Sequence, residues 1–535
     1  MKLHLLLLVC VFTLSAQQHT PSRAVWIPDN GDGTYSNPIL FADYSDPDVI
    51  RVGDDYYMTS SSFSHFPGLP ILHSNDLVNW KLIAHAVPRY PLASFDSPQH
   101  GNGIWAPSLR YHQGEYYIYY GDPDNGIFMT KAKNPAGPWE PLKLVRAAKG
   151  WIDPCPFWDD DGSAYLVHAY ARSRAGINSI LTLRKMSPDG TAILADSTML
   201  FDGRESHPTI EGPKMYKRGG YYYVFAPAGG VKSGWQTALR SRNIDGPYED
   251  KIVLQQGSTA VNGPHQGAWV ETQTGESWFI HFQDRGAYGR VVHLEPMRWS
   301  DGWHLVGEDY DGNGIGEPVG TFKKPNVGRS FPIETPQTSD EFDSVQLGLQ
   351  WQWQANPQAE WLSLAARKGW LRMVSQSLPQ GASNVWSLGS LLLQKFPAEE
   401  FSATTKLEFF PKSTGEKAGL IVFGLDYSYI ALEQTETGTV VSQVVCANAD
   451  AGQPEQLVVS NSVEAKSIFF RVTVSSGARC KFSYSLDGSN FIAMGSEFTA
   501  KPGKWVGAKV GVFAVTPYGS PSPGHADVDW LRIHP

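Results

Sequence analysis

The segment YSDPDVIRVGDDYYM (residues 44–58) combines an acidic beginning with a strongly β-forming end. Apolar and aromatic residues flank the polar turn at Asp54–Asp55, which is typical of two short strands joined as a hairpin. The preceding SDPD is polar, and its proline suits the first position of a strand, where a missing N–H does little harm. The segment therefore predicts a β-hairpin whose entrance carries acidic side chains.

The same pattern recurs along the first two-thirds of the chain. A Gly or Asp turn followed by paired aromatic residues occurs at 52–60, 112–121, 159–169, 217–227 and 273–282. Successive units are spaced by roughly 50 to 60 residues, enough for one four-stranded sheet each, and helical periodicity is almost absent. We therefore expect a five-bladed β-propeller over residues 17–321. A series of hairpins within a β-sandwich is the alternative.

Each unit places a distinctive residue where its first strand begins. In a propeller the first strand of every blade lines the central channel, so these residues should meet at one end of it. The residues are Asp46, Ala106, Asp153, Glu211 and His265. The repeat therefore predicts a pocket that contains three carboxylates and an imidazole, which explains a polar strand entrance.

Clustered carboxylates suit acid–base chemistry. Like charges a few ångströms apart raise at least one pKa, so one carboxylic acid can face one ionised carboxylate, as in glycoside hydrolases. A wide propeller channel favours the separation of about 6.5–9.5 Å found in inverting enzymes over the roughly 5–5.5 Å of retaining ones. A retaining enzyme and a carbohydrate-binding propeller without catalysis are the alternatives. An isolated Asp–Pro would more simply be a capped turn.

Four segments carry a specific resemblance. They are NPILFADYSDPDVIRVGDDYYM, WAPSLRYHQGEYYIYY, WIDPCPFWDDDGSAYL and IEGPKMYKRGGYYYVF. In this order they resemble the signature segments of glycoside hydrolase family 43, over residues 33–320. The usual PDPS motif is here SDPD, so Ser45 and Asp48 depart from the family pattern.

The resemblance implies a role for each matching residue. Asp46 would be the general base that activates water, and Glu211 the general acid that protonates the departing oxygen. Asp153 would orient Glu211 and keep its pKa high. Arg290 in YGRVV would contact the sugar. His265 in GPHQG matches an axial histidine that in several members lies near a calcium ion, so it is also a candidate metal ligand.

Several rings are candidate sugar-contacting surfaces. They are Phe63, His65, Phe66, Trp105, Trp151 and Phe282. Core packing between blades is the alternative for each of them. His65 lies in FSHFPG, where related β-xylosidases often carry a tryptophan. We expect that segment to wall the pocket, so His65 favours an arabinofuranosyl substrate over a xylosyl one.

The remaining third of the chain has a different pattern. Residues 322–339 are rich in Pro, Ser, Thr and Lys and predict a linker, whereas residues 340–535 alternate with period two and predict an antiparallel β-sandwich of the jelly-roll type. This part resembles the concanavalin-like C-terminal domain of β-xylosidases and arabinofuranosidases of the family, which can lend a loop to the active-site rim. The acidic segments 340–343 and 527–530 could hold a structural calcium ion, and salt bridges are the alternative.

The N-terminus MKLHLLLLVCVFTLSAQQ predicts a secretory signal peptide over residues 1–16, hence export to the periplasm or the cell surface. No other segment is apolar enough to cross a membrane. The net charge of −9 and the lack of a basic tract argue against a nucleic-acid partner. Cys446 and Cys480 could pair, and the oligomeric state stays open.

Together these features predict an exported, inverting, exo-acting glycosidase whose chemistry requires no cofactor. Its expected substrates are oligosaccharides of plant hemicellulose, such as arabinoxylan or xyloglucan fragments. The expected products are terminal α-L-arabinofuranosyl groups, β-D-xylosyl groups, or both. β-D-xylosidase as the main activity is the alternative.

Overall fold

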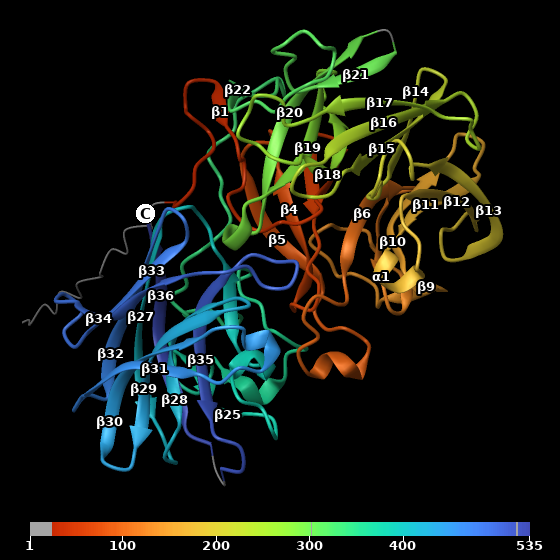
Figure 1. The fold of residues 1–535 in the computed structure, drawn as a ribbon. Coiled ribbons are helices and arrows are strands. Elements are labelled where there is room, and N and C mark those ends of the chain that lie inside the picture. Colours follow the sequence, from red (N-terminus) through yellow and green to blue (C-terminus); the bar gives the residue numbers. More distant parts are fainter. Residues whose placement is uncertain (1–23, 301, 521–522) are drawn as a thin grey trace, which may run out of the picture.

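The structure, a computed structural model, describes residues 24–300, 302–520 and 523–535, so the predicted signal peptide lies outside it. The described chain is almost entirely β-structure and forms two bodies side by side (Figure 1). Its helical turns are short: η1 (Ala93–Asp96), α1 (Arg172–Ala175), η2 (Gly286–Tyr288), η3 (Ala359–Trp361), η4 (Val385–Ser387) and η5 (Ala449–Ala451). Within the described residues, no helix is long and apolar enough to cross a membrane.

The first body is the predicted five-bladed β-propeller, which is confirmed. Over the described residues it has five antiparallel four-stranded sheets whose strands follow chain order. The blades are β2 (Asp48–Val52), β3 (Asp55–Thr59), β4 (Gly68–Ser74), β5 (Trp80–Val87); β6 (Trp105–His112), β7 (Glu115–Asp122), β8 (Gly126–Ala132), β9 (Lys143–Ala147); β10 (Trp151–Trp158), β11 (Ala164–Tyr170), β12 (Ile180–Met186), β13 (Ile193–Asp202); β14 (Lys214–Arg218), β15 (Tyr221–Ala228), β16 (Trp235–Ser241), β17 (Glu249–Leu254); and β18 (His265–Glu271), β19 (Ser277–Asp284), β20 (Arg290–Ser300), β21 (Trp303–Val306). Around the central channel, the first strand β6 contacts β2 and β10, β10 also contacts β14, and β18 contacts β2 and β15.

A left-handed backbone residue recurs where each blade begins. The residues with positive φ are Asp46 (55°), Ala106 (31°), Asp153 (55°), Gly212 (58°) and Gln266 (23°). In blades 2, 3 and 5 the register of the first hairpin shifts at this point. The predicted repeat positions are therefore corrected by one residue in blades 4 and 5, because Glu211 and His265 stand just before the left-handed position rather than in it.

The second body is the predicted β-sandwich, also confirmed. One sheet contains β23 (Leu362–Ser363), β24 (Leu371–Val374), β36 (His525–His534), β27 (Phe401–Phe410), β32 (Ser467–Ser475), β33 (Arg479–Ser485) and β34 (Ile492–Thr499). The other contains β25 (Gln376–Ser377), β35 (Lys509–Thr516), β28 (Lys417–Phe423), β29 (Tyr427–Thr435), β30 (Gly438–Cys446) and β31 (Gln456–Ser462), with β26 (Leu392–Lys395) paired to β35. Both sheets contribute to one core, for example through Leu407 and Leu420. Cys446 and Cys480 are buried, unpaired thiols, so they form no disulfide.

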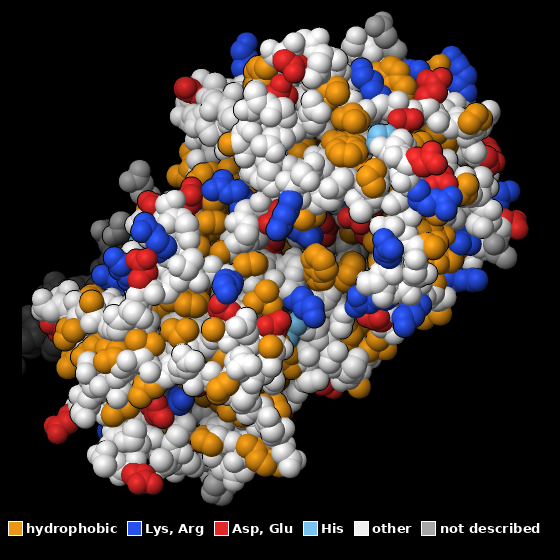
Figure 2. All heavy atoms as spheres, in the orientation of Figure 1, with side chains coloured by type: hydrophobic (Ala, Val, Ile, Leu, Met, Phe, Trp, Pro, Cys, Tyr) orange, Lys and Arg blue, Asp and Glu red, His pale blue; other side chains and the backbone are white. Residues whose placement is uncertain are grey.

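Backbone hydrogen bonds join the two bodies. Phe66 and Trp353 exchange N–H···O bonds of 3.2 and 2.7 Å, and the Ala508 N–H donates to the Ala287 carbonyl at 2.7 Å. Near the start of the predicted linker, β22 (Thr321–Lys323) pairs with β1 (Thr34–Ser36). On the face shown in Figure 2, acidic and basic side chains are interspersed rather than gathered into a wide basic patch. The backbone hydrogen bonds of Phe66 with Trp353 and of Ala508 with Ala287 thus pack the sandwich against the propeller by specific contacts.

Candidate active site

A cavity of about 130 Å³ opens at the end of the channel where the first strands begin. Asp46, Asp153 and Glu211, from blades 1, 3 and 4, all line it. The structure therefore brings together the three carboxylates that the sequence places far apart.

Asp46 lies in surroundings that stabilise a negative charge. Its Oδ2 accepts a hydrogen bond of 2.5 Å from the Ser61 hydroxyl, and its Oδ1 lies 3.2 Å from a guanidinium nitrogen of Arg290. Ser61 is itself fixed, because its Oγ accepts the Ala106 N–H at 2.7 Å. Charge-assisted hydrogen bonds of this kind are short and fix the direction of the carboxylate oxygens. Asp46 is therefore suited to accept a proton.

Asp153 holds the backbone beside Glu211. Its Oδ2 accepts the Gly212 N–H at 2.8 Å, and Gln266 Nε2 lies 3.5 Å from the same oxygen. Burial and the nearby Asp46 charge raise the pKa of Asp153 to about 7. Because Gly212 directly follows Glu211, this bond fixes where the Glu211 side chain leaves the main chain.

Glu211 is suited to donate a proton. Burial, followed by the charges of Asp153 and Asp46, raises its pKa to about 8, so it is mostly protonated at neutral pH. Its side chain keeps 30% of its surface exposed. Its Oε1 lies 3.5 Å from Nε2 of His265. Burial and the Arg290 charge lower the pKa of His265 to about 3, so this imidazole is neutral.

Four further predicted residues, Phe63, Trp105, His265 and Arg290, also line the cavity. The rings of Phe63 and Trp105 meet edge to face with centroids 6.2 Å apart. The Arg290 guanidinium additionally lies 3.2 Å from the Ser45 hydroxyl. These side chains form an aromatic wall and a cationic wall around the carboxylates.

The other four predicted sugar contacts lie outside the cavity lining. His65 is buried against the sandwich, with its Nε2 3.1 Å from the Gln354 side-chain oxygen, so the expectation that it walls the pocket is wrong. Phe66 is fully buried among Tyr90 and Phe95. The reason is the same for both residues, because the second domain covers the segment that carries them.

Trp151 and Phe282 lie outside the cavity lining and pack against other side chains of the propeller. Trp151 stacks on His168 with centroids 4.4 Å apart and lies under the Arg184 guanidinium. Phe282 is fully buried and lies behind His265 and Arg290, 5.4 Å from the His265 ring and 4.8 Å from the guanidinium. Both predictions of direct sugar contact are therefore corrected to packing roles.

The sequence alone did not indicate several lining residues, which are Ile152, Val231, Gln266 and Trp505. Trp505 comes from the sandwich, has φ +68° and is 51% exposed. Its ring centroid lies 6.0 Å from that of Trp105 and 6.0 Å from the Arg290 guanidinium. Its segment, KPGKWVGAK, carries no local signal for a binding site, since its position depends on how the domains dock.

The residues around His265 fit a metal ion poorly. Its two ring nitrogens are buried and have no hydrogen-bond partner among the described residues. However, His265 is one nitrogen ligand beside one carboxylate oxygen, whereas calcium takes six to eight oxygen ligands. In the described chain, the tight group of three possible ligands lies elsewhere, at His281, His293 and Glu295. The side chains around His265 therefore do not form a metal site.

The acidic segments of the sandwich also fit calcium poorly. Asp527 is bound by Arg372 at 2.7 Å and lies 3.4 Å from Arg367. Asp340 accepts the Phe342 N–H and the Trp351 indole N–H. These carboxylates are engaged by cations and N–H donors, as the salt-bridge alternative expects.

Comparisons with known proteins agree with this geometry. The profile of "Glycosyl hydrolases family 43" matches residues 35–304, and that of "Beta xylosidase C-terminal Concanavalin A-like domain" matches residues 339–534. A putative beta-xylosidase of Xylanibacter ruminicola is 42% identical over 90% of this chain and 86% of its own length. A non-reducing end alpha-L-arabinofuranosidase of Bacteroides ovatus is 33% identical over 75% of this chain and 76% of its own.

Solved structures show the same two-domain architecture. The crystal structure of a xylan beta-1,4-xylosidase from Bacillus halodurans superposes with a TM-score of 0.83 at 26% identity, over 94% of this chain and all of that one. With the acidic propeller pocket and both matching domains in place, this chain belongs to glycoside hydrolase family 43.

Proposed function

We propose that this glycoside hydrolase is an exported exo-acting enzyme that releases terminal pentosyl groups from hemicellulose oligosaccharides with inversion of configuration. The observation that carries the proposal is that two carboxyl groups in one small cavity, those of Asp46 and Glu211, have contrasting surroundings. Asp46 is bound to Arg290, whereas burial and neighbouring carboxylates raise the pKa of Glu211 to about 8. One ionised base and one protonated acid are what such hydrolysis needs.

In the proposed reaction, Asp46 takes a proton from a water molecule as the water oxygen bonds to the anomeric carbon. The glycosidic C–O bond breaks, and Glu211 gives its proton to the departing oxygen. Asp153 positions Glu211 through Gly212. The small cavity, narrowed by Trp105 and Trp505, favours one terminal sugar over a chain that passes through.

β-D-xylosyl groups are the proposed main substrate, and α-L-arabinofuranosyl groups are the second candidate. The sequence-based preference for arabinofuranosyl rested on His65, which lies outside the cavity. The relative with 42% identity is named a putative beta-xylosidase, whereas a relative with 33% identity is named an arabinofuranosidase. These two observations therefore favour a xyloside over an arabinofuranoside as the main substrate.

The test compares kcat/KM for 4-nitrophenyl β-D-xyloside and 4-nitrophenyl α-L-arabinofuranoside. The proposal expects turnover of at least one of them, with a higher value for the xyloside. NMR of the first anomer released should show inversion, and retention would overturn that part. Export, which rests on the N-terminal segment, is tested by fractionating cells that express the full chain.

A further inference from the structure

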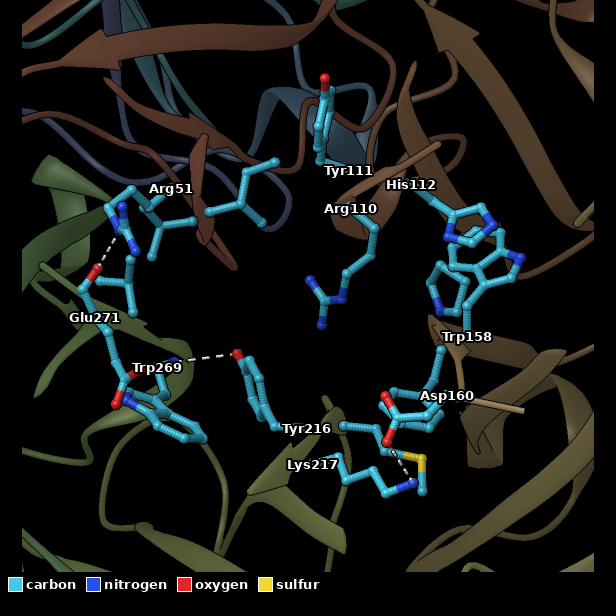
Figure 3. Close-up of a pocket in the computed structure, with 16 residues that line it drawn as sticks. Arg51, Arg110, Tyr111, His112, Trp158, Asp160, Tyr216, Lys217, Trp269 and Glu271 are labelled. Atoms are coloured by element: carbon cyan, nitrogen blue, oxygen red, sulfur yellow. Dashed lines mark hydrogen bonds and ion pairs between the residues drawn. The ribbon is translucent and has the colours of Figure 1, made fainter. Parts of the chain in front are cut away.

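We infer that the cavity at the opposite end of the propeller channel is a second carbohydrate-binding site, which takes a neutral oligosaccharide of pentose units. The choice of pentose units rests on the proposed function, whereas the location rests on the cavity itself. This cavity measures about 510 Å³ and is lined mainly by the last residues of β2, β6, β10, β14 and β18, so every blade contributes (Figure 3).

The second cavity is separate from the catalytic one. The two have no lining residue in common. Ala106 lines the catalytic cavity and Tyr111 the second, and five residues of strand β6 at about 3.3 Å each place them roughly 17 Å apart. Between them lie the buried Asp48 and Lys214, the latter bonded to the Pro107 carbonyl and the Ser108 hydroxyl. A ligand in the second cavity therefore does not touch the catalytic carboxylates.

Aromatic side chains give the second cavity flat surfaces. His112 and Trp158 are stacked with centroids 4.5 Å apart and planes within 10°. Tyr111 stands at the rim with 46% of its surface exposed. The Arg110 guanidinium points toward the middle of the cavity, and the Tyr216 hydroxyl beside it accepts the Trp269 backbone N–H at 3.1 Å (Figure 3). Rings with a few convergent polar groups are typical of ligand sites, and sugars present both apolar ring faces and hydroxyls.

The charges of the wall favour a neutral ligand. Three ion pairs in or beside the wall are Arg110–Asp48, Lys217–Asp160 and Arg218–Glu271. Arg51 donates instead to the carbonyls of Glu271 and Gly53. Since these cations already have partners, a polyanion would gain little from them.

Size distinguishes the ligands of the two cavities. The second is about four times as large as the catalytic one, at 510 against 130 Å³. It falls within the roughly 300–1,000 Å³ typical of small-molecule sites. If the catalytic cavity holds one terminal sugar, the second has room for several linked units. The second cavity would bind several linked sugar units and so keep the enzyme close to its substrate.

Calorimetric titration with xylotetraose tests the inference, using a Glu211→Gln background that prevents cleavage. We expect two binding events, and Tyr111→Ala should weaken one of them at least tenfold. His112→Ala provides a second variant of the same wall. The matched control is Tyr310→Ala, because Tyr310 is an exposed propeller tyrosine outside the cavity. Identical isotherms in all variants would overturn the inference.

Turnover of aryl glycosides distinguishes a failure of the proposed function from a failure of the second binding site. In the otherwise unaltered chain, Tyr111→Ala should leave kcat/KM for 4-nitrophenyl glycosides unchanged, which also shows that the variant is folded. Hydrolysis combined with identical isotherms would reject the second site and retain the proposed function. Failure to hydrolyse either aryl glycoside would reject the proposed function, whereas a Tyr111-dependent binding event would still support the second site.

Discussion

Asp43 joins the sandwich to the rim of the catalytic cavity through Gly507. Its Oδ2 accepts the Gly507 N–H at 3.1 Å, while its Oδ1 accepts the Arg290 N–H at 2.9 Å. Gly507 follows Trp505 by two residues, and Arg290 contacts Asp46. One buried carboxylate thus sets the positions of two cavity walls that come from different domains.

Replacing Asp43 should therefore impair catalysis without altering any group that touches the sugar. An Asn can accept only one of the two N–H groups, and its own NH₂ would face the other. A charged, buried hydrogen bond contributes about 1.5–3 kcal/mol, so Asp43→Asn should lower kcat/KM roughly 10- to 100-fold. Steady-state kinetics on an aryl glycoside measures this. A kcat/KM within twofold of the unaltered enzyme would contradict the positioning role.

Trp505→Ala should weaken binding more than chemistry. Its ring lines the cavity beside Trp105 and Arg290, so its loss should raise KM about tenfold, equivalent to about 1.4 kcal/mol, with a smaller change in kcat. Tyr518→Ala, at a tyrosine of the sandwich that is 60% exposed, is the control. If both variants gave the same KM, the sandwich would contribute nothing to substrate binding.

Gly212→Ala should disturb Glu211 through the backbone. Gly212 has φ +58°, and an added Cβ would lie 2.7 Å from Cγ of Gln266. Gly219→Ala is a closely matched control, because its φ is +57° and its added Cβ would meet nothing within 4 Å. Both variants should lose about 1 kcal/mol of unfolding free energy from backbone strain. Only Gly212→Ala should also lose kcat, and equal kcat values would argue against the Asp153–Gly212 contact as a positioning device.

The raised pKa of Glu211 predicts how stability depends on pH. In the folded state its pKa is about 8, compared with an ordinary value of 4.5. Between these values the unfolded chain ionises Glu211 while the folded chain keeps it protonated, so the residue lowers stability as the pH rises. Glu211→Gln removes this effect, and its Tm advantage should grow from pH 5 to pH 8. Calorimetry at several pH values checks this, and a constant difference would contradict it.

The recurring hairpin pattern predicted the propeller and the acidic pocket, and the period-two alternation predicted the sandwich. Asp46 and Asp153 share the same Asp–Pro context and the same left-handed backbone. The repeat also predicted Glu211, although Glu211 stands one residue before the left-handed Gly212.

Two of the four incorrect sugar contacts lie where the two domains meet, whereas Trp151 and Phe282 pack within the propeller. His65 and Phe66 lie beneath the sandwich, and Trp505 reaches the pocket from it, so their environments depend on docking rather than on nearby sequence. The second cavity was also missed. Its walls are the far ends of the same five strands, whereas the repeat pattern points only to the residues where these strands begin.

The central claim is that Glu211 is the proton donor. The most direct test is how the loss of kcat/KM in Glu211→Gln depends on the leaving group of the substrate. If Glu211 is the proton donor, the variant should lose about 10²–10⁴ in kcat/KM on xylobiose, whose departing sugar needs a proton. It should lose far less on 2,4-dinitrophenyl β-D-xyloside, whose leaving group departs as a stable anion. An equal loss on both substrates, or no loss on xylobiose, would contradict the assignment of Glu211 as the acid of this pocket.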